Sequence, residues 1–186
     1  MSNQLTHLGL ILDGNRRWAN EQGKKTLQGH TEGLKNFKQR VLNIAERKEI
    51  DYLTAYTLST ENFQNRSQHE LEHLFSLIED LIEHKQDFLE HNIELKTIGK
   101  TKQLPDEAQQ TLSHLKDETR ARSNLTLTLA LNYGGRDEIV RGAQKLLNSD
   151  QEDEDLTEEN FAKLLDSRFL PPMDLLIRTG GHKRIS

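Results

Sequence analysis

The chain of 186 residues is long enough to form one ordinary domain with a hydrophobic core. It has no cysteine, which excludes disulfides and cysteine-ligated zinc, and its net charge of −5 argues against a nucleic-acid partner. Because we see neither a signal peptide near residues 1–6 nor a membrane-spanning window, we expect a cytoplasmic domain over residues 1–186 with at most peripheral membrane contact.

Apolar, β-rich runs alternate with longer helical stretches along the chain. The expected strands are residues 7–12, 52–58, 93–98, 125–131 and 173–177. The expected helices are residues 31–48, 68–90, 104–120, 136–147 and a short one from about 157, after an acidic run at 150–155 that we expect to be an exposed loop. Several strands are apolar almost throughout, so the sequence predicts an α/β fold with a mostly parallel central sheet flanked by helices.

Four polar segments follow expected strands, at residues 13–17, 59–62, 132–136 and 178–181. Ligands of parallel sheets bind beyond the carboxyl ends of the strands, so four such segments indicate one shared site. Arginines lie in these segments or just after them: Arg16, Arg17, Arg66, Arg136, Arg178 and Arg184. An acidic protein with cationic loops is suited to a compact anion, although any one of these arginines alone reads as solvated surface charge.

The hexapeptide at residues 13–18 is the most informative segment. Gly14 permits a close approach of the backbone, while Arg16 and Arg17 provide charge and donors for phosphate. Asp13 repels phosphate directly, so its natural role is to hold a divalent cation there. A plain Asp-Gly turn explains the dipeptide alone, but not the whole hexapeptide. No Walker A pattern is present, which argues against a P-loop nucleotidase.

The four segments resemble the signatures of the cis-prenyltransferases, the family that includes undecaprenyl diphosphate synthase. The matching residues are 7–19 with 29–30, then 59–63, 132–136, 174–181 and 184–186. Because they occur in the family's order and spacing, the chain is identified as a member. The resemblance implies condensation of isopentenyl diphosphate with an allylic diphosphate such as farnesyl diphosphate, giving a cis-polyprenyl diphosphate. It also implies Mg²⁺ as cofactor and a homodimer.

The resemblance implies roles for individual residues. Asp13 matches the essential aspartate that handles Mg²⁺, and Asn62 matches the residue that assists proton removal. An amide is a weak base, so we expect Asn62 to position the proton or a water molecule. The residues that match the binding site of the allylic diphosphate are Gly14, Asn15, Arg16, Arg17, Trp18 and His30.

Two further groups of residues match substrate-binding positions of the family. Ser59, Thr60 and Glu61 match a loop that closes over both substrates, and Phe63 matches an aromatic position near the substrate chain, with simple packing as an equal alternative. The fourth segment matches the site for isopentenyl diphosphate through Arg178, Arg184, Ile185 and Ser186. A tunnel for the growing chain is expected between helices 31–48 and 68–90. Candidate lining residues, which ordinary core packing also explains, are Leu71, Leu74, Phe75 and Ile78.

The sequence departs from the family pattern at three places. Thr26 stands where the family usually has an arginine, and Arg66 lies one residue beyond the usual substrate-binding arginine, a place that Asn65 occupies. The sequence ends at Ser186, before an apolar segment and a glutamate that helps bind Mg²⁺ in the family. We therefore expect little activity from these residues alone. The alternatives are a catalytically impaired diphosphate-binding remnant or partner subunit and a remnant without function, but the intact first signature favours an enzyme.

Overall fold

The computed structural model describes residues 5–148 and 156–183. Within them, five strands form a parallel sheet in the order β3-β4-β2-β1-β5. The strands are β1 (His7–Ile11), β2 (Tyr52–Ser59), β3 (Ile93–Ile98), β4 (Leu125–Tyr133) and β5 (Leu175–Arg178). This confirms the predicted α/β fold, while the expected loop at residues 150–155 lies outside the described residues.

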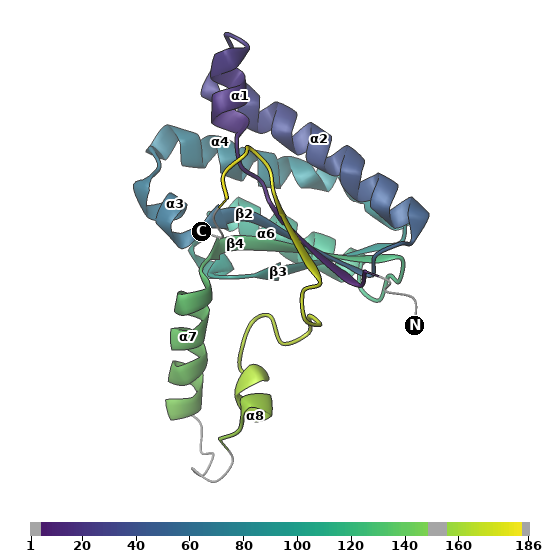
Figure 1. Ribbon diagram of the computed structural model, residues 1–186, viewed down its shortest axis with the longest axis vertical. Coiled ribbons are helices and arrows are strands. Elements are labelled where there is room, and N and C mark those ends of the chain that lie inside the picture. Colours follow the sequence, from purple (N-terminus) through teal and green to yellow (C-terminus); the bar gives the residue numbers. More distant parts are fainter. Residues whose placement is uncertain (1–4, 149–155, 184–186) are drawn as a thin grey trace.

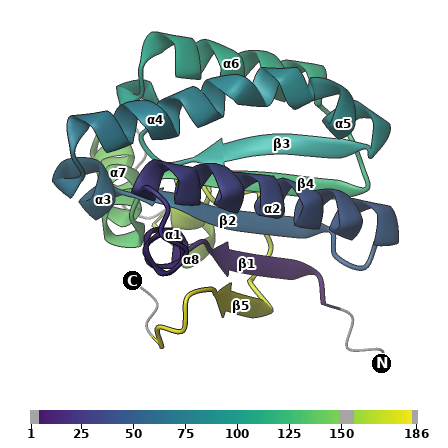
Figure 2. The ribbon, with the colours of Figure 1, turned by 90° about the horizontal axis from the view of Figure 1, so that it is seen from above.

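Helices cover both sides of the sheet. They are α1 (Asn15–Glu21), α2 (Thr26–Arg47), α3 (Thr60–Asn65), α4 (Gln68–Glu79), α5 (Lys85–Glu90), α6 (Asp106–Glu118), α7 (Gly135–Leu147) and α8 (Glu158–Ala162), with 3₁₀ helices η1 (Asp80–His84) and η2 (Thr101–Gln103). Figures 1 and 2 show α2 and α4 above the sheet, α6 beside α4 at the β3 edge, and α7 and α8 on the opposite side. None of the helices in the described part of the chain is long and apolar enough to cross a membrane.

Two helices differ from the sequence prediction. The helix expected from residue 31 begins at Thr26, because the backbone N–H of Lys25 donates a hydrogen bond of 2.9 Å to the side chain of Gln28, which closes the first turn. His30 therefore lies inside α2 and is buried. The single helix expected over residues 68–90 is also wrong, because η1 separates α4 from α5.

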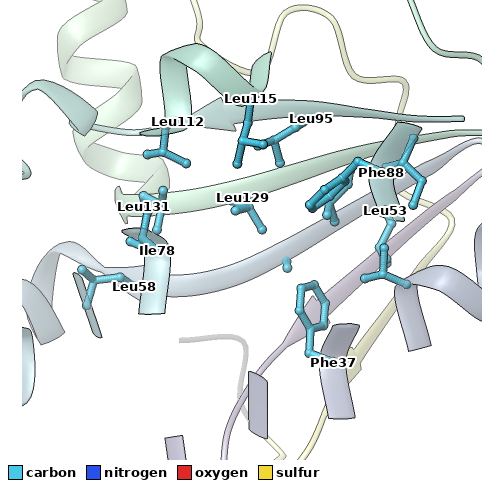
Figure 3. Close-up of a cluster of buried hydrophobic side chains, with 14 of the residues drawn as sticks. Phe37, Leu53, Leu58, Ile78, Phe88, Leu95, Leu112, Leu115, Leu129 and Leu131 are labelled. Atoms are coloured by element: carbon cyan, nitrogen blue, oxygen red, sulfur yellow. The ribbon is translucent and has the colours of Figure 1, made fainter. Parts of the chain in front are cut away.

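The core lies between the sheet and the helices above it. Figure 3 shows Leu53 and Leu129 of the central strands facing Phe37 of α2, Ile78 of α4 and Phe88 of α5. All five side chains are buried, and full burial of such a side chain contributes about 1.5–3 kcal/mol to folding. This layer fixes α2 and α4 over the sheet, and both helices contribute residues to the candidate site.

Candidate active site

The carboxyl ends of all five strands meet at one edge, since every neighbouring pair in the sheet is parallel. Ile11 pairs with Arg178, which places the segments after β1 and β5 side by side. Ser59 pairs with Tyr133, which does the same for the segments after β2 and β4. The predicted convergence of the four polar segments is therefore confirmed.

The first and fourth segments are joined by a pair of opposite charges. Arg178 donates two hydrogen bonds to Oδ2 of Asp13, 2.7 Å from Nη2 and 3.0 Å from Nε. The backbone N–H of Gly14 donates to Asp13 Oδ1 over 2.7 Å. Burial opposes ionisation of this carboxyl, but the hydrogen bonds from Arg178 and Gly14 outweigh it and hold the pKa of Asp13 below its usual value. Asp13 is therefore an ionised carboxylate near neutral pH.

The turns that follow β1 and β5 also touch through their backbones. Thr179 Oγ1 donates to the carbonyl oxygen of Asp13 over 2.6 Å and accepts from the Asp13 N–H over 2.9 Å. Gly14 has a φ of 97°, and a Cβ added there would lie 2.9 Å from the Cα of Gly180. Glycine is required at position 14 both for this left-handed conformation and for the close approach.

A second cluster centres on Glu70 in the first turn of α4. Its carboxylate, in a residue only 8% exposed, accepts a hydrogen bond of 3.0 Å from His30 Nε2. Oε1 of Glu70 also lies 3.4 Å from Arg66 Nη1 and 4.0 Å from Arg16 Nε. Burial lowers the pKa of His30 more than Glu70 raises it, so the imidazole is neutral near pH 7.

Glu70 was not among the site residues predicted from the sequence. The signal was present, because Glu70 stands four residues after Arg66, a spacing typical of helical ion pairs. Arg66 Nη1 is buried and has no hydrogen-bond partner among the described residues, although Glu70 lies close to it. A buried guanidinium with unused donor capacity is suited to an anionic ligand.

A cavity of about 370 Å³ connects the two clusters to the space between α2 and α4. The polar residues at its mouth are Asp13, Asn15, Arg16, Arg17, His30, Arg66 and His182. Its walls are mostly apolar and include Phe37 and Val41 of α2 and Leu129 of β4. From the predicted stripe, Leu74 and Ile78 line this cavity, whereas core packing accounts for Leu71 and Phe75. The cavity therefore combines an anion-binding mouth with an apolar interior.

Residues 11–186 match the family model described as putative undecaprenyl diphosphate synthase. The chain belongs to this prenyltransferase family. The isoprenyl transferase of Wolinella succinogenes is 37% identical, with 99% of this chain covering 79% of that protein. The isoprenyl transferase of Treponema denticola is 40% identical, with 100% of this chain covering 81% of that protein.

Solved structures agree with this membership. Lavandulyl diphosphate synthase from Lavandula x intermedia, in complex with dimethylallyl diphosphate, superposes with a TM-score of 0.88 at 30% identity, over 98% of this chain and 80% of the other. A probable undecaprenyl diphosphate synthase from Campylobacter jejuni has a TM-score of 0.77 at 28% identity, over 99% and 79% of the two chains. The fold of the described residues is therefore the fold of this family.

The structure brings some of the predicted binding residues together and leaves others apart. The predicted residues at the cavity mouth are Gly14 and the polar residues 13, 15–17, 30 and 66. His182 also lies there, although it was not predicted. Trp18 is exposed outside the cavity wall, with Lys24 Nζ 4.9 Å from its ring centre. Arg184, Ile185 and Ser186 lie outside the described residues.

The second signature is a short helix and not the loop that we expected. Ser59 caps α3 by accepting a hydrogen bond of 3.0 Å from the backbone N–H of Asn62. Thr60, Glu61 and Asn62 form the first turn of this helix, and Glu61 and Asn62 are exposed. The ring of Phe63 lies 6.3 Å from that of Phe75, which favours the packing role. These residues lie beside the cavity and not in its wall.

The donor set at the mouth suits one kind of metal binding. Among residues 5–148 and 156–183, no three His, Asp or Glu side chains are grouped closely enough to hold a metal ion by themselves. Asp13 nevertheless provides ionised carboxylate oxygens, which can bind a metal ion, beside cationic side chains. Mg²⁺ is commonly held by one or two carboxylates together with substrate phosphates, and this arrangement fits that mode.

Proposed function

We propose that this chain condenses isopentenyl diphosphate with an allylic diphosphate, such as farnesyl diphosphate, to give a cis-polyprenyl diphosphate. The observation that carries the proposal is the cavity with Asp13, Arg16 and Arg66 at its mouth and an apolar interior. A diphosphate with a hydrocarbon tail has the complementary shape and chemistry. Each methylene of the tail that leaves water contributes roughly 0.8 kcal/mol to binding.

The proposed reaction begins when the bond between C1 and the diphosphate oxygen of the allylic substrate breaks. Arg16, Arg17 and Arg66 hold the departing diphosphate and stabilise its charge. Mg²⁺, when held by Asp13, supplies further positive charge that lowers the barrier to departure. The apolar walls, which include Leu74, exclude water from the allylic cation.

Carbon–carbon bond formation then joins the two substrates. The double bond of isopentenyl diphosphate attacks C1 of the allylic group, and loss of a proton from the adjacent carbon restores a double bond. In the proposal, the amide of Asn62 positions that proton or an accepting water, and Arg178 binds the diphosphate of isopentenyl diphosphate. The pairing of Arg178 with Asp13 supports this role, because it holds the two residues at one end of the sheet.

The test is incorporation of labelled isopentenyl diphosphate into a farnesyl primer with Mg²⁺, comparing the wild type with Asp13→Ala. We expect the variant to lose turnover while it keeps its fold. Glu32→Ala is the control, because Glu32 is an exposed carboxylate on α2 paired only with Lys35 among the described residues. Near-normal turnover in Asp13→Ala would reject the role of the aspartate. Binding of both diphosphates without turnover in the wild type would favour the impaired, diphosphate-binding alternative.

The proposal also includes the homodimer and the cytoplasmic location that the family resemblance implies. Ile139 and Val140 of α7 are neighbouring apolar side chains that are both more than half exposed, and a dimer contact on α7 would bury them. Light scattering during gel filtration measures the assembly directly, and a monomer at all concentrations would reject the dimer.

A further inference from the structure

A polar cluster interrupts the apolar wall of the cavity at a distance from its mouth. We call Lys38, His84 and Asp87 the bracket. Lys38 Nζ of α2 lies 2.6 Å from Oδ2 of Asp87 in α5 and donates to Nδ1 of His84, the last residue of η1, over 2.9 Å. His84 Nδ1 lies 3.7 Å from the same Asp87 oxygen. All three residues line the cavity.

The bracket joins the two helical stretches that enclose the cavity. Figure 2 shows α2 and the stretch from α4 to α5 side by side above the sheet. At the mouth these stretches are joined by His30 and Glu70, and farther along by Lys38 and Asp87. The eight residues from His30 to Lys38 advance about 12 Å along a helix. The apolar walls between these two levels include Leu34, Leu74 and Leu81.

An apolar tail that fills this space reaches a pair of charges. The side chains of Lys38 and Asp87 are 33% and 35% exposed, so water still reaches the pair. A hydrocarbon tail that extends past the bracket, toward Val41 and Leu42 farther along α2, takes water away from the two charges, which is unfavourable. η1 lies at the same level, and a stretch of 3₁₀ helix inside a longer helix often marks a hinge.

We propose that the bracket determines the longest hydrocarbon tail that the cavity accepts. The inference rests on the proposed function, because it requires the substrate tail to occupy the cavity. It assigns a specificity role to three residues outside the four signatures. A bracket that only ties the helices together would affect stability and leave the dependence on tail length unchanged.

The test is calorimetric binding of n-alkyl phosphates from decyl to octadecyl, each below its micelle-forming concentration. In the wild type, affinity is expected to rise about fourfold per methylene and then reach a plateau at the length that meets the bracket. In Lys38→Ala/Asp87→Ala the rise continues to longer chains. The swap Lys38→Asp/Asp87→Lys restores the ion pair and with it the plateau.

Glu32→Ala/Lys35→Ala is the matched control, because it removes an exposed ion pair of 3.3 Å on the same helix outside the cavity wall. Thermal unfolding of all variants shows which of them fold, and the swap keeps the test decisive if the alanine pair does not fold. The same plateau in the wild type and the alanine pair, or no plateau in the wild type, overturns the inference alone. Binding of no alkyl phosphate by the wild type overturns the proposed function, and the inference with it.

Discussion

His30 Nε2 donates a hydrogen bond of 3.0 Å to Glu70, although the two residues are 40 positions apart. The same carboxylate oxygen lies 3.4 Å from Arg66 Nη1. His30 and Arg66 both line the cavity mouth, whereas Glu70 lies behind them. Glu70 is therefore a positioning residue, which holds a neutral donor and a cation at the place where the proposed diphosphate binds.

Replacement of Glu70 by alanine should destabilise the protein strongly. The Arg66 side chain is only 16% exposed, and loss of one partner of a buried ion pair costs about 3–5 kcal/mol. We expect a loss in the free energy of unfolding of about this size in urea titrations. Glu72→Ala is the control, because Glu72 is an exposed residue on the same helix that accepts only from Gln68 among the described residues. Equal losses in the two variants would show that Glu70 is not a buried partner of Arg66.

The pKa of His30 predicts how stability depends on pH. Burial is the main cause of its lowered pKa, so the folded protein binds a proton at His30 less readily than the unfolded chain, whose value is near 6.5. The free energy of unfolding that neutral His30 contributes is therefore fully present above about pH 6.5, and it is lost as the pH falls below that value. Unfolding measured between about pH 7.5 and 5 should show a steeper loss in the wild type than in His30→Gln. Parallel curves would contradict the lowered pKa.

The parallel sheet and the meeting of Asp13 with Arg178 were predictable from the sequence. Uninterrupted apolar runs indicate buried parallel strands, and parallel strands bring their carboxyl ends to one edge. The role of Glu70 was not predictable in the same way, because a charged residue in the first turn of an amphipathic helix normally faces solvent. Burial of its carboxylate depends on His30 and Arg66, whose positions only the packing of α2 against α4 determines.

The predicted boundaries of two helices were wrong because of local features of the chain. The expected helix began at residue 31, but the side chain of Gln28 accepts a hydrogen bond from Lys25 and starts α2 earlier. The apolar period of residues 68–90 continues through η1, with Leu81 still packed against the core, so periodicity alone gave no sign of the break. The bracket was missed because Lys38 and Asp87 lie far apart in the sequence and become partners only when α2 packs beside α5.

Alanine at position 14 should separate the turns after β1 and β5. It would adopt a φ of 97° and place its Cβ 2.9 Å from the Cα of Gly180. The left-handed conformation alone costs roughly 1–2 kcal/mol for a residue with a Cβ. The contact with Gly180 adds to this cost and should weaken diphosphate binding, which calorimetry with inorganic diphosphate measures.

Gly23→Ala separates the two effects. Gly23 also has a positive φ, of 65°, but an added Cβ would meet nothing within 4 Å. We expect this control to lose stability through strain alone and to bind inorganic diphosphate as the wild type does. If both variants lost the same stability and neither lost binding, the approach of Gly14 to Gly180 would have no role in the site.

The ion pair of Arg178 and Asp13 lowers the pKa of the Asp13 carboxyl. Burial raises the pKa of Asp13, but the two hydrogen bonds and the charge of Arg178, together with the hydrogen bond from the Gly14 amide, outweigh it and lower the pKa. Arg178→Gln removes the charge, so the pKa of Asp13 should rise from its lowered value, because burial is then opposed mainly by the Gly14 amide and His182. Arg178→Lys keeps the charge but loses the two-donor geometry, so we expect a smaller rise.

The sign of the effect on stability follows from the direction of the shift. A folded pKa below the unfolded one gives stability that is present above about pH 3.9 and is lost as the pH falls through the folded value. Arg178→Gln should remove this component, so its stability should vary less with pH in that range than that of the wild type. Carboxyl titration by NMR measures the Asp13 pKa, with Arg168→Gln as the control because Arg168 donates to a backbone carbonyl. An Asp13 pKa that is the same in Arg178→Gln and Arg168→Gln would show that Arg178 does not control the charge of the carboxylate proposed to hold Mg²⁺.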